Sequence, residues 1–192
     1  MLLAIDVGNT NIVLGGMEQD SIRFTARMST DRTKTEDEYA MLLSNIFALR
    51  SIDPRSMDGA IVASVVPELK PILVRAIRML CGLTPMLVGS GVKTGLNIRI
   101  DNPAQLGSDL VVGAVGAQAR YPKPLLVFDF GTATTLSVVD REGVFRGGMI
   151  LPGLRLSVDA LSARAAQLPC ITFTQPEGLL GTDTVSCMRS GA

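Results

Sequence analysis

The stretch LLAIDVGNTNIVLGG, residues 2–16, decides the fold because the chain repeats its pattern. An apolar run leads to Asp6-Val7-Gly8, and polar residues then precede a second apolar run. The stretch LLVFDFGTATTLSVV, residues 125–139, has the same pattern, with Asp129 and Gly131 in the places of Asp6 and Gly8. Each copy is typical of a strand, a tight turn and a second strand. In this alignment Asn9, Thr10, Asn11 and Ile12 fall on Thr132, Ala133, Thr134 and Thr135.

The glycine and its polar neighbours in each turn suit the binding of a phosphate group. Glycine tolerates a positive φ and lets the backbone approach a ligand closely. The exposed backbone amides of such a turn, with Asn or Thr side chains beside them, can cradle phosphate oxygens. An Asp at the end of a buried strand is placed to hold a cation that bridges those oxygens. Because the turn recurs at a domain-sized separation, we predict a duplicated fold whose two phosphate loops face one cleft.

The composition is that of a globular protein with a sizeable core. The chain has 192 residues, 47% of them hydrophobic and 19% charged, with 18 basic and 18 acidic side chains. This balance favours neither nucleic acid nor an anionic membrane as a partner. No apolar run approaches the ~20 residues of a membrane span, and the N-terminus lacks the features of a signal peptide. We therefore expect a cytoplasmic protein.

The cysteine and histidine content narrows the possible chemistry. Cys81, Cys170 and Cys187 are odd in number and scattered, so neither a disulfide framework nor a zinc site is indicated. The chain has no histidine. Any general base must therefore be a carboxylate, a lysine or a bound water.

Local signals arrange the rest of the chain as alternating helices and strands. Thr35 and Glu38 form a capping box ahead of an amphipathic helix, and Pro67 is expected to begin a second helix. Together with the hairpins, they predict an α/β fold with mixed sheets flanked by helices. We expect a first domain at residues 1–121 and a second at residues 122–192. The second is predicted to be incomplete at its C-terminus, because a full copy would need roughly 50 more residues.

Two further segments are candidates for chemistry. Residues 106–109, Leu-Gly-Ser-Asp, open a helix, and Asp109 lies in its first turn, where the helix dipole stabilises the ionised carboxylate. Asp109 is then either a helix-capping residue or an acid–base group. Residues 147–153 place a Gly-Gly and a Pro-Gly around three apolar residues. That pattern is typical either of a backbone packed against a ligand or of an ordinary strand with bends.

Taken together, these residues resemble the type III pantothenate kinases, a family of the actin, Hsp70 and sugar-kinase superfamily. The resemblance runs from the Asp6-Val7-Gly8 turn to the turn at Thr184, and it includes the segments around Asp109 and residues 147–153. It implies a duplicated actin-like (ribonuclease H-like) ATPase fold. It also implies ATP-dependent phosphorylation of pantothenate to 4'-phosphopantothenate, the first step of coenzyme A biosynthesis. Such enzymes are homodimers that use magnesium-ATP with potassium or ammonium.

The resemblance also implies roles for individual residues. Asp109 would be the proton acceptor, Asp129 would help to hold the monovalent cation, and Thr132 would contact ATP. The pantothenate pocket would be lined by Ile100, Gly107, Ser108, Asp109, Leu110 and Thr184. The ATP phosphates would be held by Asp6, Val7, Gly8, Asn9, Thr10, Asn11, Ile12 and Val13.

Two positions depart from the family pattern, both on the acceptor side. The family usually has Gly-Ala-Asp-Arg where this chain has Gly107-Ser108-Asp109-Leu110. Leu110 cannot supply a guanidinium fork for the pantothenate carboxylate. Ile100 stands where the family commonly has an aromatic residue. These departures leave two alternatives open: a related kinase or phosphatase for another small acceptor, and a catalytically silent ATP-binding regulator of actin-like fold.

Overall fold

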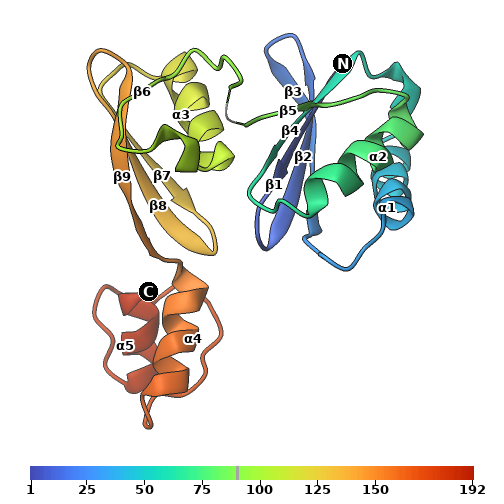
Figure 1. Cartoon of the computed structure of the whole chain (residues 1–192). Helices are drawn as coiled ribbons and strands as arrows, with labels where there is room; N and C mark the ends of the chain where they lie inside the picture. The colour runs from blue at the N-terminus through green and yellow to red at the C-terminus, as the bar shows by residue number, and fades with distance from the viewer. Residues whose placement is uncertain (90) are drawn as a thin grey trace. The chain divides into compact units, whose positions relative to one another are not determined.

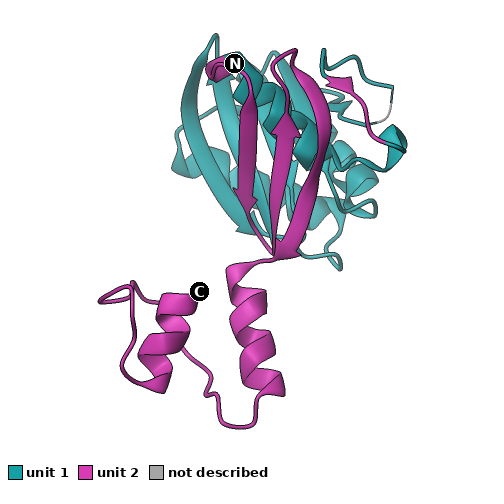
Figure 2. Ribbon diagram, turned by 90° about the vertical axis from the view of Figure 1, so that its left-hand side faces the viewer, with its two compact units in different colours: residues 1–96, 101–119 teal, residues 97–100, 120–192 magenta. Residues whose placement is uncertain are grey.

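The computed structural model describes residues 1–89 and 91–192 and forms two compact units (Figure 1). The first unit consists of residues 1–96 and 101–119, and the second of residues 97–100 and 120–192 (Figure 2). Each unit contains one β-sheet. Within the described residues, no helix is both long enough and apolar enough to cross a membrane.

The first unit is built on a mixed sheet of five strands in the order β3-β2-β1-β4-β5. The first three strands form an antiparallel meander, and β4 and β5 run parallel to β1. Leu3, Ile5 and Val7 alternate along β1 and are almost fully buried, so they mark the core face of the sheet. The strands are β1 (Leu2–Val7), β2 (Asn11–Glu18), β3 (Ser21–Ser29), β4 (Gly59–Ser64) and β5 (Met86–Leu87).

Two helices, α1 (Glu36–Leu49) and α2 (Leu69–Cys81), cover the core face of this sheet (Figure 1). Tyr39, Leu43 and Phe47 of α1 are buried against it. Each buried side chain of this size stabilises the fold by about 2 kcal/mol. The helices and the sheet therefore share one hydrophobic core.

The two helix starts predicted from the sequence have different outcomes. The capping box of α1 is confirmed: Oγ1 of Thr35 accepts from the Glu38 amide at 3.4 Å, and Oε2 of Glu38 accepts from the Thr35 amide at 2.8 Å. The expected start at Pro67 is wrong by two residues, since α2 begins at Leu69. The Leu69 amide donates to Val66 O at 3.2 Å and closes a four-residue turn that leads into the α-helix.

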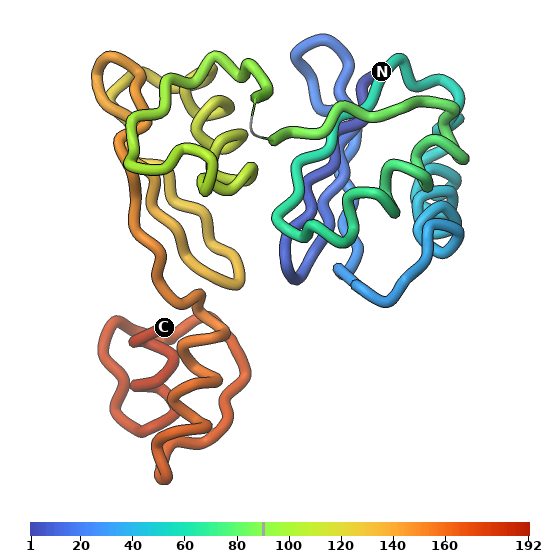
Figure 3. Tube along the Cα trace, viewed as in Figure 1, coloured from blue at the N-terminus to red at the C-terminus, as the bar shows by residue number. Residues whose placement is uncertain are grey.

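The second unit has a sheet of four strands in the order β6-β9-β8-β7. Strands β7, β8 and β9 are antiparallel neighbours, and β6 pairs in parallel with β9. After β9 come two helices joined by the irregular residues 165–183 (Figure 3). These elements are β6 (Asn97–Ile98), β7 (Leu125–Phe130), β8 (Ala133–Val139), β9 (Val144–Pro152), α4 (Leu154–Arg164) and α5 (Thr184–Gly191).

The remaining elements belong to the first unit, apart from Arg120 at the end of α3. Helix α3 (Ser108–Arg120) follows the short 3-10 helix η2 (Pro103–Gln105), and another, η1 (Pro54–Ser56), precedes β4. Asp109 is the second residue of α3 and therefore lies in its first turn, as the sequence predicted. The first helical hydrogen bond runs from the Val111 amide to Gly107 O at 3.2 Å.

Candidate functional site

The first candidate phosphate turn joins β1 to β2. The last pair of the hairpin is Val7 with Ile12, and the Gly8 amide donates to Asn11 O at 3.0 Å to close the turn. A Cβ on Gly8 would lie 3.1 Å from that same oxygen, so glycine allows the tight closure. Asp6 precedes the turn and is exposed on the face opposite to the core. The carboxylate therefore stands beside the turn and outside the core.

The second candidate turn, between β7 and β8, is one residue shorter. Phe130 pairs with Thr134, and the Gly131 amide donates to Ala133 O at 3.0 Å. The expected alignment of Ile12 with Thr135 is therefore wrong by one position, because Thr134 occupies the place of Ile12. A shift of one residue turns the side chains of the following strand to the other face. The two turns are related in pattern but differ in which side chains flank the Asp.

Two of the three glycines within residues 147–153, Gly148 and Gly153, pack closely against protein backbone, whereas Gly147 has a positive φ of 130°. A Cβ on Gly148 would lie 2.1 Å from Leu136 O of the neighbouring strand. A Cβ on Gly153 would lie 2.2 Å from Gly131 O, and the Gly153 amide donates to Thr132 O at 3.0 Å. The segment after β9 thus packs directly on the second turn and supports it.

Asp129 is exposed near the end of β7. Its neighbours Phe128 and Phe130 stack on each other, with ring centroids 6.1 Å apart and ring planes at 12°. Because side chains alternate along a strand, the two rings and the carboxylate lie on opposite faces. Asp129 therefore has the same position in its hairpin that Asp6 has in the first: one residue before the x-Gly turn.

The start of α3 is tied to the same edge of the first sheet as the first turn. The hydroxyl of Ser108 donates to Ser64 O and accepts from the Ser64 amide, both at 3.1 Å. Ser64 ends β4 and pairs with Val7, the residue directly before the turn. The sequence pattern did not single out Ser64. The structure thus brings the first phosphate turn and the residues around Asp109 to one edge.

Gly107 leaves room for the carboxylate of Asp109. A Cβ on Gly107 would lie 2.3 Å from Oδ1 of Asp109, closer than such atoms ever approach. The carboxylate therefore folds back over the residue that precedes the helix. Asp109 and Leu110 are both partly exposed, so ligands can reach this end of the helix.

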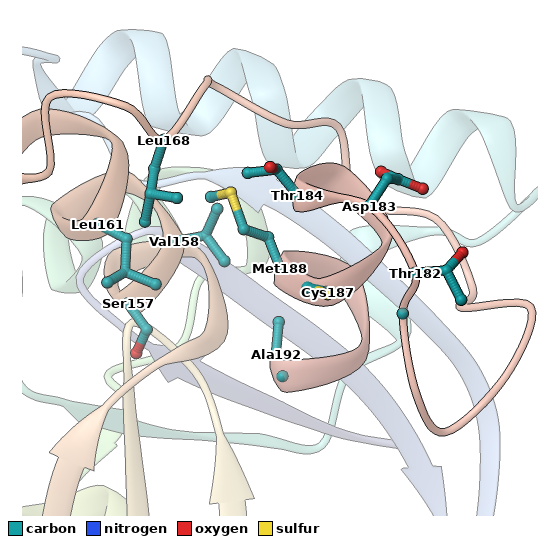
Figure 4. Close-up of a pocket in the computed structure, with 12 residues that line it drawn as sticks. Ser157, Val158, Leu161, Leu168, Thr182, Asp183, Thr184, Cys187, Met188 and Ala192 are labelled. Carbon is teal, nitrogen blue, oxygen red and sulfur yellow. The ribbon is translucent and has the colours of Figure 1, made fainter.

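Thr184 is the first residue of α5 and borders an open cavity of about 700 Å³ between α4 and α5 (Figure 4). The N-cap is Asp183, whose carboxylate accepts from the amides of Val185 at 2.9 Å and Ser186 at 3.0 Å. Hydrogen bonds from the Ser186 amide and hydroxyl hold the pKa of the Asp183 carboxyl below its ordinary value. The helix start beside Thr184 is therefore capped by an ionised carboxylate. The cavity is lined by Ser157, Val158, Leu161, Leu168, Gly181, Thr182, Asp183, Thr184, Cys187, Met188, Gly191 and Ala192.

The predicted site residues divide between the two units. The first unit holds residues 6–13 and residues 107–110. The second unit holds Ile100, two residues after the end of β6, together with Asp129, Thr132 and Thr184. Sequence reasoning missed Thr30 and Arg32, which hydrogen-bond to the first turn: Oγ1 of Thr30 donates to Gly8 O at 2.7 Å, and Arg32 donates to Oδ1 of Asn9 at 3.0 Å.

The residues at the first turn fit a divalent metal carried by a nucleotide. Among residues 1–89 and 91–192, no group of three or more His, Cys, Asp or Glu side chains could enclose a metal ion. Magnesium in phosphoryl-transfer enzymes is usually held by one or two carboxylates and by phosphate oxygens of the substrate. A single exposed carboxylate beside a glycine turn, as at Asp6, satisfies the protein's part of that arrangement.

Comparison with solved structures identifies the fold. A Campylobacter jejuni protein assigned to the Baf family of transcriptional activators matches with a TM-score of 0.56 at 16% identity, covering 98% of this chain and 72% of that one. A Sinorhizobium meliloti protein assigned as a 2-dehydro-3-deoxygalactonokinase matches with a TM-score of 0.52 at 12% identity, covering 91% of this chain and 62% of that one. The expected actin-like α/β fold, with mixed sheets flanked by helices, is confirmed by these neighbours.

Comparison with protein families and curated relatives identifies the family. The family model described as type III pantothenate kinase matches residues 2–192. The type III pantothenate kinase of Moorella thermoacetica is 44% identical over 191 residues, which cover 100% of this chain and 75% of that protein. The enzyme of Listeria monocytogenes is 43% identical over 195 residues, covering 100% of this chain and 74% of its own length. The chain therefore belongs to the type III pantothenate kinase family.

Proposed function

We propose that this protein transfers the γ-phosphoryl group of ATP to the primary hydroxyl of pantothenate. The product, 4'-phosphopantothenate, is the first intermediate on the way to coenzyme A. Membership in the family supports the reaction. One structural observation supports a working site in this chain: the paired hydrogen bonds between Ser108 and Ser64 hold the start of α3 at the sheet edge that carries the first phosphate turn. An acid–base group and a phosphate-binding turn then share one rigid support.

The two glycine turns would hold the nucleotide. The turn after β1, with flanking residues 6–13, offers backbone amides and polar side chains to phosphate oxygens. Thr132 of the second turn would contact ATP, and Asp129 would help to hold a monovalent cation, potassium or ammonium. The carboxylates of Asp6 and Asp129 are exposed near the ends of β1 and β7, which suits contact with a cation and a phosphate together. When magnesium-ATP is bound, ATP supplies the phosphoryl group and the magnesium ion neutralises part of the phosphate charge.

Asp109 would accept the proton of the attacking hydroxyl. Phosphoryl transfer through a loose transition state depends mainly on positioning and charge neutralisation, so a carboxylate is a sufficient base. A positioned base contributes about 10²–10⁴ to the rate. The chain has no histidine that could take this role. The space left by Gly107 allows the Asp109 carboxylate to face the end of the helix rather than its side.

The family pattern suggests which residues would contact the acceptor. Gly107, Ser108 and Leu110 would contribute from the start of α3, and Ile100 and Thr184 from the second unit. The hydroxyl of Ser108 already bonds to Ser64, so Ser108 would meet the acceptor through its backbone. Because Leu110 has no charge, the pantothenate carboxylate needs another partner.

The proposal includes a homodimer in the cytoplasm. The three cysteines of the protein are free, and Cys170 and Cys187 are exposed, which suits a reducing compartment. The molar mass in solution, measured by light scattering after size-exclusion chromatography, tests the dimer.

ATP turnover with and without pantothenate tests the activity. We expect ADP release that depends on pantothenate and 4'-phosphopantothenate as the product, identified by mass spectrometry. Asp6→Asn and Asp129→Asn should abolish turnover and leave the circular dichroism spectrum unchanged, because both carboxylates are exposed. Turnover that does not depend on pantothenate would favour another small acceptor. Tight ATP binding without turnover would favour a catalytically silent nucleotide-binding protein.

A further inference from the structure

The segment directly after β3 is hydrogen-bonded to the first phosphate turn through Thr30 and Arg32. The Thr30 amide donates to Thr10 O at 2.9 Å, and the Thr30 hydroxyl donates to Gly8 O at 2.7 Å. The Arg32 guanidinium donates to Oδ1 of Asn9 at 3.0 Å. Each of the three turn residues therefore receives a hydrogen bond from this segment. These three hydrogen bonds tie the segment to the turn.

The segment is itself fixed to the core of the first unit. Tyr39 of α1 is fully buried, and its hydroxyl donates to Asp31 O at 2.8 Å and accepts from the Asp31 amide at 3.0 Å. The carboxylate of Asp31 accepts from the Thr33 amide at 2.9 Å and from the Thr33 hydroxyl at 2.7 Å. Arg32 thus projects from a backbone that is held on both sides.

Within residues 1–89 and 91–192, no carboxylate neutralises the charge of Arg32. Asp31 forms its ion pair with Lys34 at 3.2 Å, and among the described residues no ion pair includes Arg32. Its hydrogen-bond partner is the neutral amide oxygen of Asn9, and the Arg32 residue is exposed. A full positive charge therefore lies next to the turn. The guanidinium N–H groups that do not bond to Asn9 face solvent.

A guanidinium in this setting is suited to a phosphate oxygen. Its planar fork matches two oxygens of one phosphate, and it is weakly hydrated, so contact with an anion costs little desolvation. The hydrogen bond to Asn9 orients the fork before any ligand arrives. Preorganisation of this kind lowers the entropy lost when the ligand binds.

We propose that Arg32 directly contacts the terminal phosphates of the nucleotide bound at residues 8–10, and that Asn9 holds the guanidinium ready for this contact. This inference rests on the proposed kinase activity. It adds a charged phosphate ligand from outside the glycine turn, supplied by a residue that the Asp-x-Gly pattern does not contain. Thr30 has a different role, because both of its hydrogen bonds support the backbone of the turn.

The test compares Arg32→Gln with a matched control, Arg50→Gln. Arg50 is also exposed, and its guanidinium also donates to a neutral oxygen, Thr25 O, at 3.1 Å. It lies at the end of α1 and takes no part in the proposed site. Arg32→Lys is a second variant that keeps the charge and removes the planar fork.

Binding of ATP and of adenosine is measured by calorimetry for the wild-type protein and each variant, together with KM for ATP and for pantothenate. We expect Arg32→Gln to weaken ATP binding about 10- to 100-fold, the range for loss of a hydrogen bond to a charged group. Adenosine binding and KM for pantothenate should not change. The ATP affinity of Arg32→Lys should lie between that of the wild type and that of Arg32→Gln. Arg50→Gln should match the wild type throughout.

Three outcomes overturn the inference, and they can be told apart. If wild type turns over ATP and Arg32→Gln binds ATP equally well, Arg32 does not contact phosphate. If ATP and adenosine weaken equally in Arg32→Gln, the residue only supports the turn, and a lower melting temperature should accompany that result. If the wild-type protein binds no ATP at all, both this inference and the proposed function fail together.

Discussion

Replacing Gly107 with Ala tests the placement of the Asp109 carboxylate without changing that residue. The added methyl would lie 2.3 Å from Oδ1 of Asp109, so the carboxylate must swing away by roughly 1 Å. A displacement of that size at a catalytic group costs about 10²-fold in rate, or ~2.7 kcal/mol of transition-state stabilisation. The φ of Gly107 lies outside the left-handed region, so the backbone accepts alanine and the fold should survive.

Gly113→Ala on the same helix is the matched control. A Cβ on Gly113 would meet nothing within 4 Å, so this change adds a methyl group to α3 without steric conflict. It should stabilise the helix by about 0.5–1 kcal/mol and leave kcat unchanged.

A coupled assay of ADP release at saturating ATP and pantothenate gives kcat for both variants. We expect Gly107→Ala to lose about 10²-fold in kcat with nearly the wild-type affinity for ATP, because the phosphate turn is not touched. Asp109→Asn in the same assay should lose about 10²–10⁴-fold. The reasoning is refuted if Gly107→Ala keeps full kcat while Asp109→Asn does not, since the position of the carboxylate would then be irrelevant. It is also refuted if both variants keep full activity, since Asp109 would then only cap the helix.

Three further changes probe the supports around this site. Ser108→Ala leaves the backbone groups of Ser64 without their hydroxyl partner and should lower the free energy of unfolding by about 1–3 kcal/mol in a urea titration; an unchanged midpoint would mean that the tether contributes nothing. Leu110→Arg restores a guanidinium fork and should lower KM for pantothenate, whereas an unchanged KM would show that another group already binds the carboxylate. Hydrogen bonds from Thr33 lower the pKa of Asp31 from 3.8 to about 2, so the stability that Asp31 provides is present above about pH 4 and is lost as the pH falls toward 2; Asp31→Asn should show a flatter acid-unfolding curve in that window, and a curve parallel to the wild type would contradict this.

The sequence by itself determined the elements whose signals are local. The two Asp-x-Gly hairpins, the capping box at Thr35 and the helix that begins near Asp109 each depend on residues a few positions apart, and each is present in the structure. The fold class followed from the repeated hairpin, and the family from the segments around it. Local hydrogen bonds and side-chain alternation decide these features, so a short window of sequence contains the information.

Only the tertiary structure decided how these elements support one another. The second turn is a residue shorter than the first, because the closing bond from Gly131 reaches Ala133 rather than the next residue along the chain. The bonds from Ser108 to Ser64 and from Arg32 to Asn9 join residues far apart in the chain. Such contacts leave no periodicity or spacing in the sequence, because they arise only when separate elements pack together. The sequence therefore indicated which candidate site residues are present. The packing decided where the charged and hydroxyl groups that support them lie.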